Sequence, residues 1–132
     1  MALDPANRES KKLVWTGRIL SALPVLLLLF SAVLKFMKPP AVTEGFQKLG
    51  YPDNTLLPLG FVELICTVLY VIPQTSVLGA ILLTGYLGGA TLTQLRVGDA
   101  FFAPTVLGVL VWGGLFLRDP RLRSLIPVRR LP

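Results

Sequence analysis

The sequence predicts an all-α membrane protein, built as a bundle of four transmembrane helices. Hydrophobic residues make up 53% of the 132 residues and charged residues only 15%, and the mean hydropathy is +0.68. A soluble domain of this length carries far more charge. Apolar segments use most of the chain, which leaves no room for a second domain. We therefore expect one integral membrane domain over residues 1–132.

The apolar segments cover residues 19–37, 56–72, 77–95 and 101–117. Each holds about 17 to 19 residues, close to the ~17 residues that a helix needs to cross a hydrocarbon core of roughly 30 Å. The first segment also resembles the apolar part of a cleaved signal peptide. Its end, "KFMKP", lacks a small-residue cleavage site and three further segments follow it, so we expect it to be retained.

Turn signals separate these segments. Pro39 and Pro40 end the first helix, and the stretch "GYP" marks a turn later in the same connection. Between them Val42, Phe46 and Leu49 repeat at i, i+4 and i+7, which predicts a short amphipathic helix on the membrane surface. A plain surface loop is the alternative. The short connections "PQTS" and "RVGDA" complete the path of the chain.

Positive charge is concentrated at the two ends of the chain. Nine of the thirteen Lys and Arg residues lie in the tails 1–18 and 118–132, whereas the "PQTS" turn has none. Lysine and arginine favour the cytoplasmic side, and an even number of spans returns the chain to the side where it began. Both termini are therefore predicted to be cytoplasmic. A nucleic-acid-binding protein would instead show a basic face on a soluble fold, so no nucleic-acid partner is expected.

Candidate ligand-binding residues are predicted to share the outer leaflet: Lys35, Glu63, Thr91, Gln94 and Arg96. An ionised carboxylate at this depth costs several kcal/mol unless it is paired or hydrated, so Glu63 must face the bundle interior, meet Lys35 or Arg96, or be protonated. Two interpretations stay open. These residues pin the helices together, or they surround a cavity for a lipid-soluble ligand with polar oxygens, such as a quinone. A proton path has thin support from one carboxylate.

Glycines recur in the last two apolar segments. Small residues four positions apart let helix backbones approach closely in lipid, where the gain is dispersion contact. The sequence thus predicts helix packing at Gly79, Gly85, Gly88, Gly89, Gly113 and Gly114. The alternative is that the glycines leave room for a flat ligand.

Residues for independent catalysis are scarce. Cys66 is the single cysteine and the chain has no histidine, so disulfides, thiol relays, haem ligation and His-based metal sites lack their parts. No nucleophile arrangement, metal cluster or nucleotide-binding loop stands out. We expect no metal site, no catalytic residue and no intrinsic cofactor, and any enzymatic role to be that of a subunit.

Several stretches together resemble the DoxX-like family of small four-helix bacterial membrane proteins: "LPVLLLLFSAVLKF", "FQKLGYP", "PLGFVELICTVLYVIPQTSVLGAILLTGYLGGATLTQLRVGDAFFAP" and "WGGLFLRDPRLRSLIP". The resemblance implies residence in the bacterial inner membrane. The founding member of the wider family is the small membrane subunit of a thiosulfate:quinone oxidoreductase. The resemblance therefore implies an accessory subunit of a larger oxidoreductase or electron-transfer complex, or alternatively a protein that binds quinone or another lipid-soluble ligand. Membrane lipids and other membrane protein subunits are the expected partners.

The resemblance also assigns roles to residues. The acidic position of the family in the second helix falls on Glu63, its lysine at the end of the first helix on Lys35, and its glycine-rich turns on Gly79, Gly88 and Gly89. Gln94 stands where family members often have histidine. Glutamine can hydrogen-bond a carbonyl but cannot transfer a proton near neutral pH, so redox or proton-coupled activity is less expected in this chain.

Overall fold

The computed structural model describes residues 5–129 and residue 131. That part of the chain contains helices and no strand, which confirms the predicted all-α class. The helices are α1 Pro5–Met37, α2 Pro40–Lys48, α3 Leu56–Val71, α4 Ser76–Arg96, α5 Phe102–Arg118 and α6 Pro120–Arg123, with single 3-10 turns η1 Asp53–Thr55 and η2 Pro73–Thr75 before α3 and α4.

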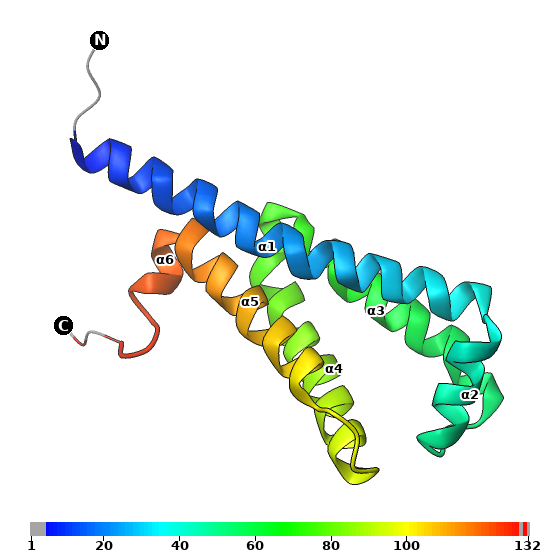
Figure 1. Cartoon of the computed structure of the whole chain (residues 1–132). Coiled ribbons are helices and arrows are strands. Elements are labelled where there is room, and N and C mark those ends of the chain that lie inside the picture. The colour runs from blue at the N-terminus through cyan, green and yellow to red at the C-terminus, as the bar shows by residue number, and fades with distance from the viewer. Residues whose placement is uncertain (1–4, 130, 132) are drawn as a thin grey trace.

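The four long helices form a ring in which each packs against two others. α1 contacts α3 and α5, and α4 contacts the same two helices from the other side (Figure 1). Toward the end that carries α2, the α4 and α5 pair diverges from the α1 and α3 pair (Figure 1). The site described below lies where these two pairs of helices diverge.

The helices coincide with the four apolar segments of the sequence. By length and composition, Lys11–Met37 and Pro73–Arg96 are suited to cross a membrane, and Leu56–Val71 and Phe102–Arg118 are shorter apolar helices. Large apolar side chains also cover the outside of the bundle, with Leu26, Phe30, Leu92 and Val109 all more than 60% exposed. A surface of this kind is expected against lipid and not against water.

Helix α1 begins well before the apolar segment that marks it in the sequence. It starts at Pro5, so most of the basic tail predicted before residue 19 is helical. Proline is accepted in the first turn of a helix, where its missing N–H has no partner to lose. With 33 residues, α1 is about 50 Å long, well over the roughly 30 Å of a hydrocarbon core. Charge marks where a membrane span ends, and it does not end the helix.

The short helix predicted in the first connection is present as α2. Pro40 occupies its first turn, and residues with positive φ stand on both sides of it, Lys38 at 52° and Gly50 at 84°. Gly50 accepts this conformation at little cost because it has no Cβ. The chain thereby turns sharply before and after α2. This helix lies at the end of the bundle where α4 and α5 diverge from α1 and α3 (Figure 1).

The opposite end is tightly packed around Tyr70, which is fully buried on α3. Its hydroxyl donates to the carbonyl of Val111 on α5 at 2.7 Å and lies 2.9 Å from Oγ of Ser21 on α1. A Cβ added to Gly114 would stand 2.8 Å from the backbone nitrogen of Ser21, and one on Gly79 would stand 2.3 Å from that of Tyr70. We call this region the closed end.

The other glycines predicted to pack helices do not do so within this chain. A Cβ added to any of them would meet no heavy atom of another helix within 4 Å: Gly85, Gly88, Gly89 and Gly113. Inside the bundle these four lie at no close helix contact, and Gly79 and Gly114 are the predicted positions that lie at such contacts. Spacing along one helix cannot show which face meets a neighbour, because that depends on how the helix is rotated in the bundle.

Candidate functional site

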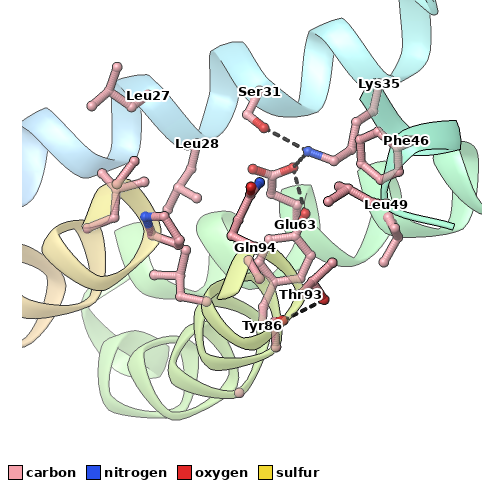
Figure 2. A pocket seen from close by; sticks show the side chains of 18 of the residues that line it. Leu27, Leu28, Ser31, Lys35, Phe46, Leu49, Glu63, Tyr86, Thr93 and Gln94 are labelled. Carbon is pink, nitrogen blue, oxygen red and sulfur yellow. Dashed lines mark hydrogen bonds and ion pairs between the residues drawn. The ribbon is translucent and has the colours of Figure 1, made fainter. Parts of the chain in front are cut away.

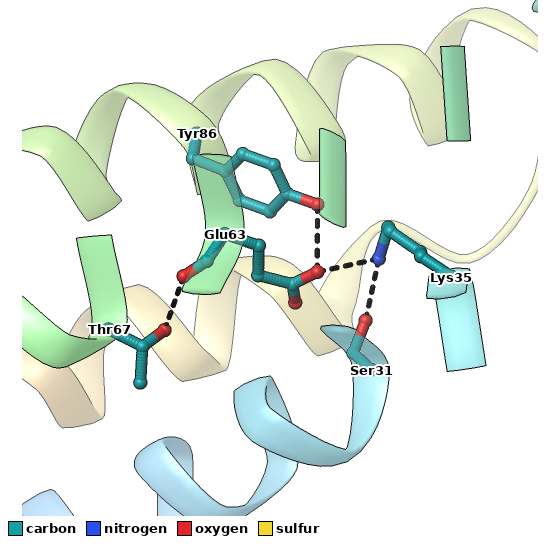
Figure 3. A network of polar contacts seen from close by, with 5 residues as sticks. All are labelled: Ser31, Lys35, Glu63, Thr67 and Tyr86. Carbon is teal, nitrogen blue, oxygen red and sulfur yellow. Dashed lines mark hydrogen bonds and ion pairs between the residues drawn. The ribbon is translucent and has the colours of Figure 1, made fainter. Parts of the chain in front are cut away.

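A buried ion pair joins α1 to α3. Lys35 Nζ lies 2.7 Å from Oε2 of Glu63, and the two side chains are 9% and 1% exposed (Figure 3). Lys35 also donates to Oγ of Ser31 at 2.7 Å, one helical turn earlier. Of the two cations that the sequence offered to Glu63, the structure selects Lys35.

A third helix contributes a donor to the same carboxylate oxygen. Tyr86 on α4 donates to Oε2 of Glu63 at 3.2 Å, and Thr67 donates to the backbone carbonyl of Glu63 at 2.7 Å (Figure 3). Oε1, the other carboxylate oxygen, accepts no hydrogen bond from the described residues, and Figure 3 shows it directed away from both Lys35 and Tyr86. Among the described residues this oxygen therefore has no hydrogen-bond partner, and it borders the cavity described below instead of being sealed in the protein.

Gly60 explains how Glu63 comes so close to α1. A Cβ at this position would stand 3.2 Å from Cβ of Lys35 and 3.2 Å from Cε1 of Phe36, tighter than ordinary contact. Since residues three apart share a helix face, the close approach at Gly60 carries Glu63 to the ammonium. Burying two charges costs several kcal/mol each, and the short pair geometry together with Tyr86 and Ser31 offsets that cost.

A cavity of about 470 Å³ adjoins the ion pair (Figure 2). We call it the Glu63 cavity. Its polar lining residues come from α1, α3, α4 and the turn after α2: Ser31, Lys35, Tyr51, Glu63, Tyr86, Thr93 and Gln94. Leu27, Leu28 and Leu107 form apolar walls, and Gly85 and Gly89 face the cavity on α4. The volume lies in the range of small-molecule sites, which are mostly apolar with a few placed polar groups.

The helix α2 and the turn after it close one side of this cavity. Phe46 and Leu49 line it, and the Phe46 ring centroid lies 5.8 Å from Lys35 Nζ. Two contacts tie this region to α4: Arg96 donates from Nη2 to the carbonyl of Leu49, and the hydroxyls of Tyr51 and Thr93 lie 2.9 Å apart. The segment is therefore a cover over the ion pair.

Two of the predicted ligand-binding residues lie elsewhere. Arg96 is exposed and holds the cover, so it does not reach Glu63 as the sequence allowed. Thr91 faces α5, where its Oγ1 lies 3.2 Å from that of Thr105 and bonds to the carbonyl of Leu87 at 2.8 Å. Thr93 lines the cavity in its place, because two positions along a helix rotate the side chain by about 200°. Lys35, Glu63 and Gln94 line the cavity.

Sequence reasoning missed Tyr86, Ser31 and Phe46 at this site. Ser31 had a signal, since it stands four residues before Lys35 and so shares its helix face. Phe46 had a partial one, since its spacing with Val42 and Leu49 predicted an apolar face on the short helix but not what that face covers. Tyr86 had none, because the sequence does not state how its helix is rotated in the bundle. Among residues 5–129 and 131, no group of three or more His, Cys, Asp or Glu side chains could hold a metal ion.

A second hollow lies on the outside of the bundle between α4 and α5. This α4–α5 groove measures about 770 Å³ and is lined almost entirely by apolar atoms, with Gly88, Gly108 and Gly113 along it. Thr91 and Trp112 also line it, and Nε1 of Trp112 donates to Oγ1 of Thr84 at 2.6 Å. Two of the unpacked glycines, Gly88 and Gly113, therefore face this groove.

Together these features define a class: a small all-α membrane protein with apolar outer faces and a buried ion pair beside an internal cavity. The chain belongs to the DoxX-like family, whose family model matches residues 19–114. That match covers α3, α4 and most of α1 and α5, and it contains Lys35, Glu63 and Gln94. Comparisons with curated proteins and with solved structures gave no match.

Proposed function

We propose that this protein binds a lipid-soluble ligand with a polar head group, of the quinone type, in the Glu63 cavity. The observation that carries the proposal is the free oxygen Oε1 of Glu63. It belongs to a side chain only 1% exposed, and it adjoins a cavity of about 470 Å³. A buried charged group without its full set of partners is costly, and a ligand head group in the cavity would supply the missing one.

The walls support a ring-shaped ligand with an apolar tail. Gly85 and Gly89 leave a flat surface on one side, with Leu27, Leu28 and Leu107 among the other walls. The polar groups stay together at the ion pair and at Gln94. The arrangement thus has one polar corner for a head group and apolar walls for the rest of a lipid-soluble molecule.

In this proposal the protein holds its ligand and does not transform it alone. Gln94 offers an amide, which binds a ligand oxygen but does not transfer protons near neutral pH. The quinone or lipid is a bound ligand and not a resident cofactor, and electron transfer, where it occurs, takes place on a partner subunit.

The same proposal includes an orientation in the membrane. All four long helices span the bacterial inner membrane with both termini in the cytoplasm, so the Glu63 cavity opens in the outer leaflet. Arg118, Arg121 and Arg123 near the end of the chain then face the cytoplasmic leaflet, where anionic lipid head groups attract them.

A pair of glycine variants tests the ligand site. Gly89→Leu places a side chain into the cavity, whereas Gly88→Leu makes the same change one residue away, facing the α4–α5 groove. After mild detergent extraction from native membrane, mass spectrometry should find a lipid-soluble ring compound with wild type and Gly88→Leu, and a loss with Gly89→Leu. Equal retention by both variants would contradict the proposal.

A second candidate function is that of an accessory subunit in a larger membrane complex. The α4–α5 groove supports it, because Gly88 and Gly113 are small residues with no partner inside the chain, and such residues let another helix approach closely. Here the roles of the two variants exchange. Gly88→Leu should lose a co-purifying membrane protein that wild type and Gly89→Leu retain, and a partner kept by all three would count against this role.

A further inference from the structure

The hydrogen-bonding groups around the Glu63 cavity can be assigned proton by proton. In the ion pair the Glu63 carboxylate only accepts. Its Oε2 accepts from Lys35 at 2.7 Å and from Tyr86 at 3.2 Å, and its Oε1 accepts from none of the described residues. Oε1 is therefore an acceptor without a partner among the described residues, and a ligand that pairs with it must supply a donor.

Most donors around this oxygen are already engaged. Two of the three ammonium protons of Lys35 go to Ser31 and Glu63, which leaves one N–H for a ligand acceptor, and the single hydroxyl proton of Tyr86 goes to Glu63. Thr93 donates to the carbonyl of Gly89 at 2.8 Å, so the hydroxyl proton of Tyr51 makes the 2.9 Å bond to Thr93. Both of these hydroxyls have thus directed their protons within the protein.

Gln94 supplies the complementary group. Its amide lines the same cavity and carries both a donor and an acceptor (Figure 2). A ligand hydroxyl could donate to Glu63 Oε1 and accept from an amide N–H. A ligand carbonyl could accept from the amide or from the remaining N–H of Lys35, but toward Oε1 it presents only lone pairs, which leaves that carboxylate oxygen unpaired beneath the bound ligand.

We infer that the Glu63 cavity selects a head group that carries a hydroxyl over one that carries only carbonyl or ether oxygens, which for a quinone-type ligand is the reduced, dihydroxy form. This inference rests on the proposed function. A site built to pair with a substrate hydroxyl discriminates strongly against analogues that lack it, because the site's own polar group is then left buried without a partner. The selection concerns binding alone and requires no electron transfer by this chain.

Three probes of matched shape test the inference on the wild-type protein in detergent under nitrogen: a decyl-substituted hydroquinone, the corresponding quinone, and the dimethyl ether of the hydroquinone. Isothermal titration should show the hydroquinone binding roughly 10- to 100-fold more tightly than the quinone, the loss expected for one unpaired buried acceptor. The dimethyl ether, which has the reduced ring but no donor, should bind as weakly as the quinone. It separates the hydroxyl from the shape and electronics of the ring.

The outcomes separate this inference from the proposed function. Binding of the quinone equal to or tighter than that of the hydroquinone overturns the inference and leaves the ligand site intact. Tight binding of the dimethyl ether also overturns it, since no donor reaches Oε1. If none of the three probes binds, both the inference and the proposed function are overturned. The wild-type comparison needs no variant that could fail to fold.

Discussion

The closed end and the Glu63 cavity use the same residue type in opposite ways. At the closed end Gly79 and Gly114 lie so close to a neighbouring helix that an added Cβ would stand 2.3 Å from the nearest atom. At the cavity Gly85 and Gly89 face empty space, with no heavy atom of another helix within 4 Å of such a Cβ. A glycine in a membrane helix thus marks either contact or room, and only its surroundings distinguish the two.

The Tyr70 hydroxyl and the Glu63 carboxylate differ in how completely they are supplied with hydrogen-bond partners. The Tyr70 hydroxyl at the closed end bonds to Val111 and Ser21 and ties three helices together. At the cavity Glu63 also joins three helices, through Lys35 and Tyr86, yet retains a free oxygen. The contrast holds for these two groups and not for every polar atom, since Nε of Arg118, beside Tyr70 at the closed end, is itself buried without a hydrogen-bond partner among the described residues. What distinguishes Oε1 of Glu63 is that it adjoins a cavity large enough for a ligand.

The largest expected effect comes from breaking the ion pair. Lys35→Met leaves the Glu63 carboxylate buried without a cation and should lower the free energy of unfolding by about 3–5 kcal/mol. Denaturant titration in mixed micelles measures it. The double variant Lys35→Met with Glu63→Leu removes both charges and should recover most of the loss, since an apolar pair of similar volume packs without stranding either ion. A double variant as unstable as the single one would show that packing, and not charge, holds this region.

The glycine comparison can be tested directly with two neighbours on α5. Gly114→Ala forces a Cβ to within 2.8 Å of the Ser21 backbone and should destabilise by about 1–3 kcal/mol. Gly113→Ala faces the α4–α5 groove and should stabilise by about 0.5–1 kcal/mol, the usual gain of alanine over glycine within a helix. Opposite signs in thermal unfolding support the comparison. A change of the same sign for both variants would contradict the comparison.

An effect below that of the ion pair is expected at Tyr86. Tyr86→Phe removes one donor to Glu63 and should cost about 1.5–3 kcal/mol, the usual range for a hydrogen bond to a charged group. Tyr51→Phe removes a bond between two neutral hydroxyls and should cost about 1 kcal/mol or less. Denaturant titration of both variants in the same micelles compares them. Equal losses would mean that the ion pair gives Tyr86 no added importance.

The smallest effect on stability is expected where Arg96 holds the cover over the cavity. Arg96→Gln removes an exposed contact to Leu49 and should change the free energy of unfolding by under about 0.5 kcal/mol. Hydrogen exchange in α2 should nevertheless become faster while exchange in α3 stays unchanged, because only the cover is released. Unchanged exchange in α2 would show that Phe46 and its apolar neighbours hold the cover without Arg96.

The sequence predicted the helices better than it predicted which faces these helices present to one another. The apolar segments located α3, α4 and α5 to within a residue or so at each end, and the proline and apolar spacing located α2. Burial cost alone required Glu63 to face the bundle interior, to meet Lys35 or Arg96, or to be protonated, and left the choice among these open. Arg96 and Thr91 do not line the cavity, and Gly85, Gly88, Gly89 and Gly113 make no close helix contact inside the bundle.

By itself the sequence determined the helical class, the approximate positions of the apolar helices and the cost of leaving the Glu63 carboxylate unpaired. These depend on composition, local turn chemistry and desolvation, which each residue carries with it. The tertiary structure alone decided that Lys35 and Tyr86 meet Glu63, that Thr93 replaces Thr91 at the cavity, and which glycines make contact. Each position rotates the side chain by about 100°, so the face a helix presents is set by the packing of all four helices together.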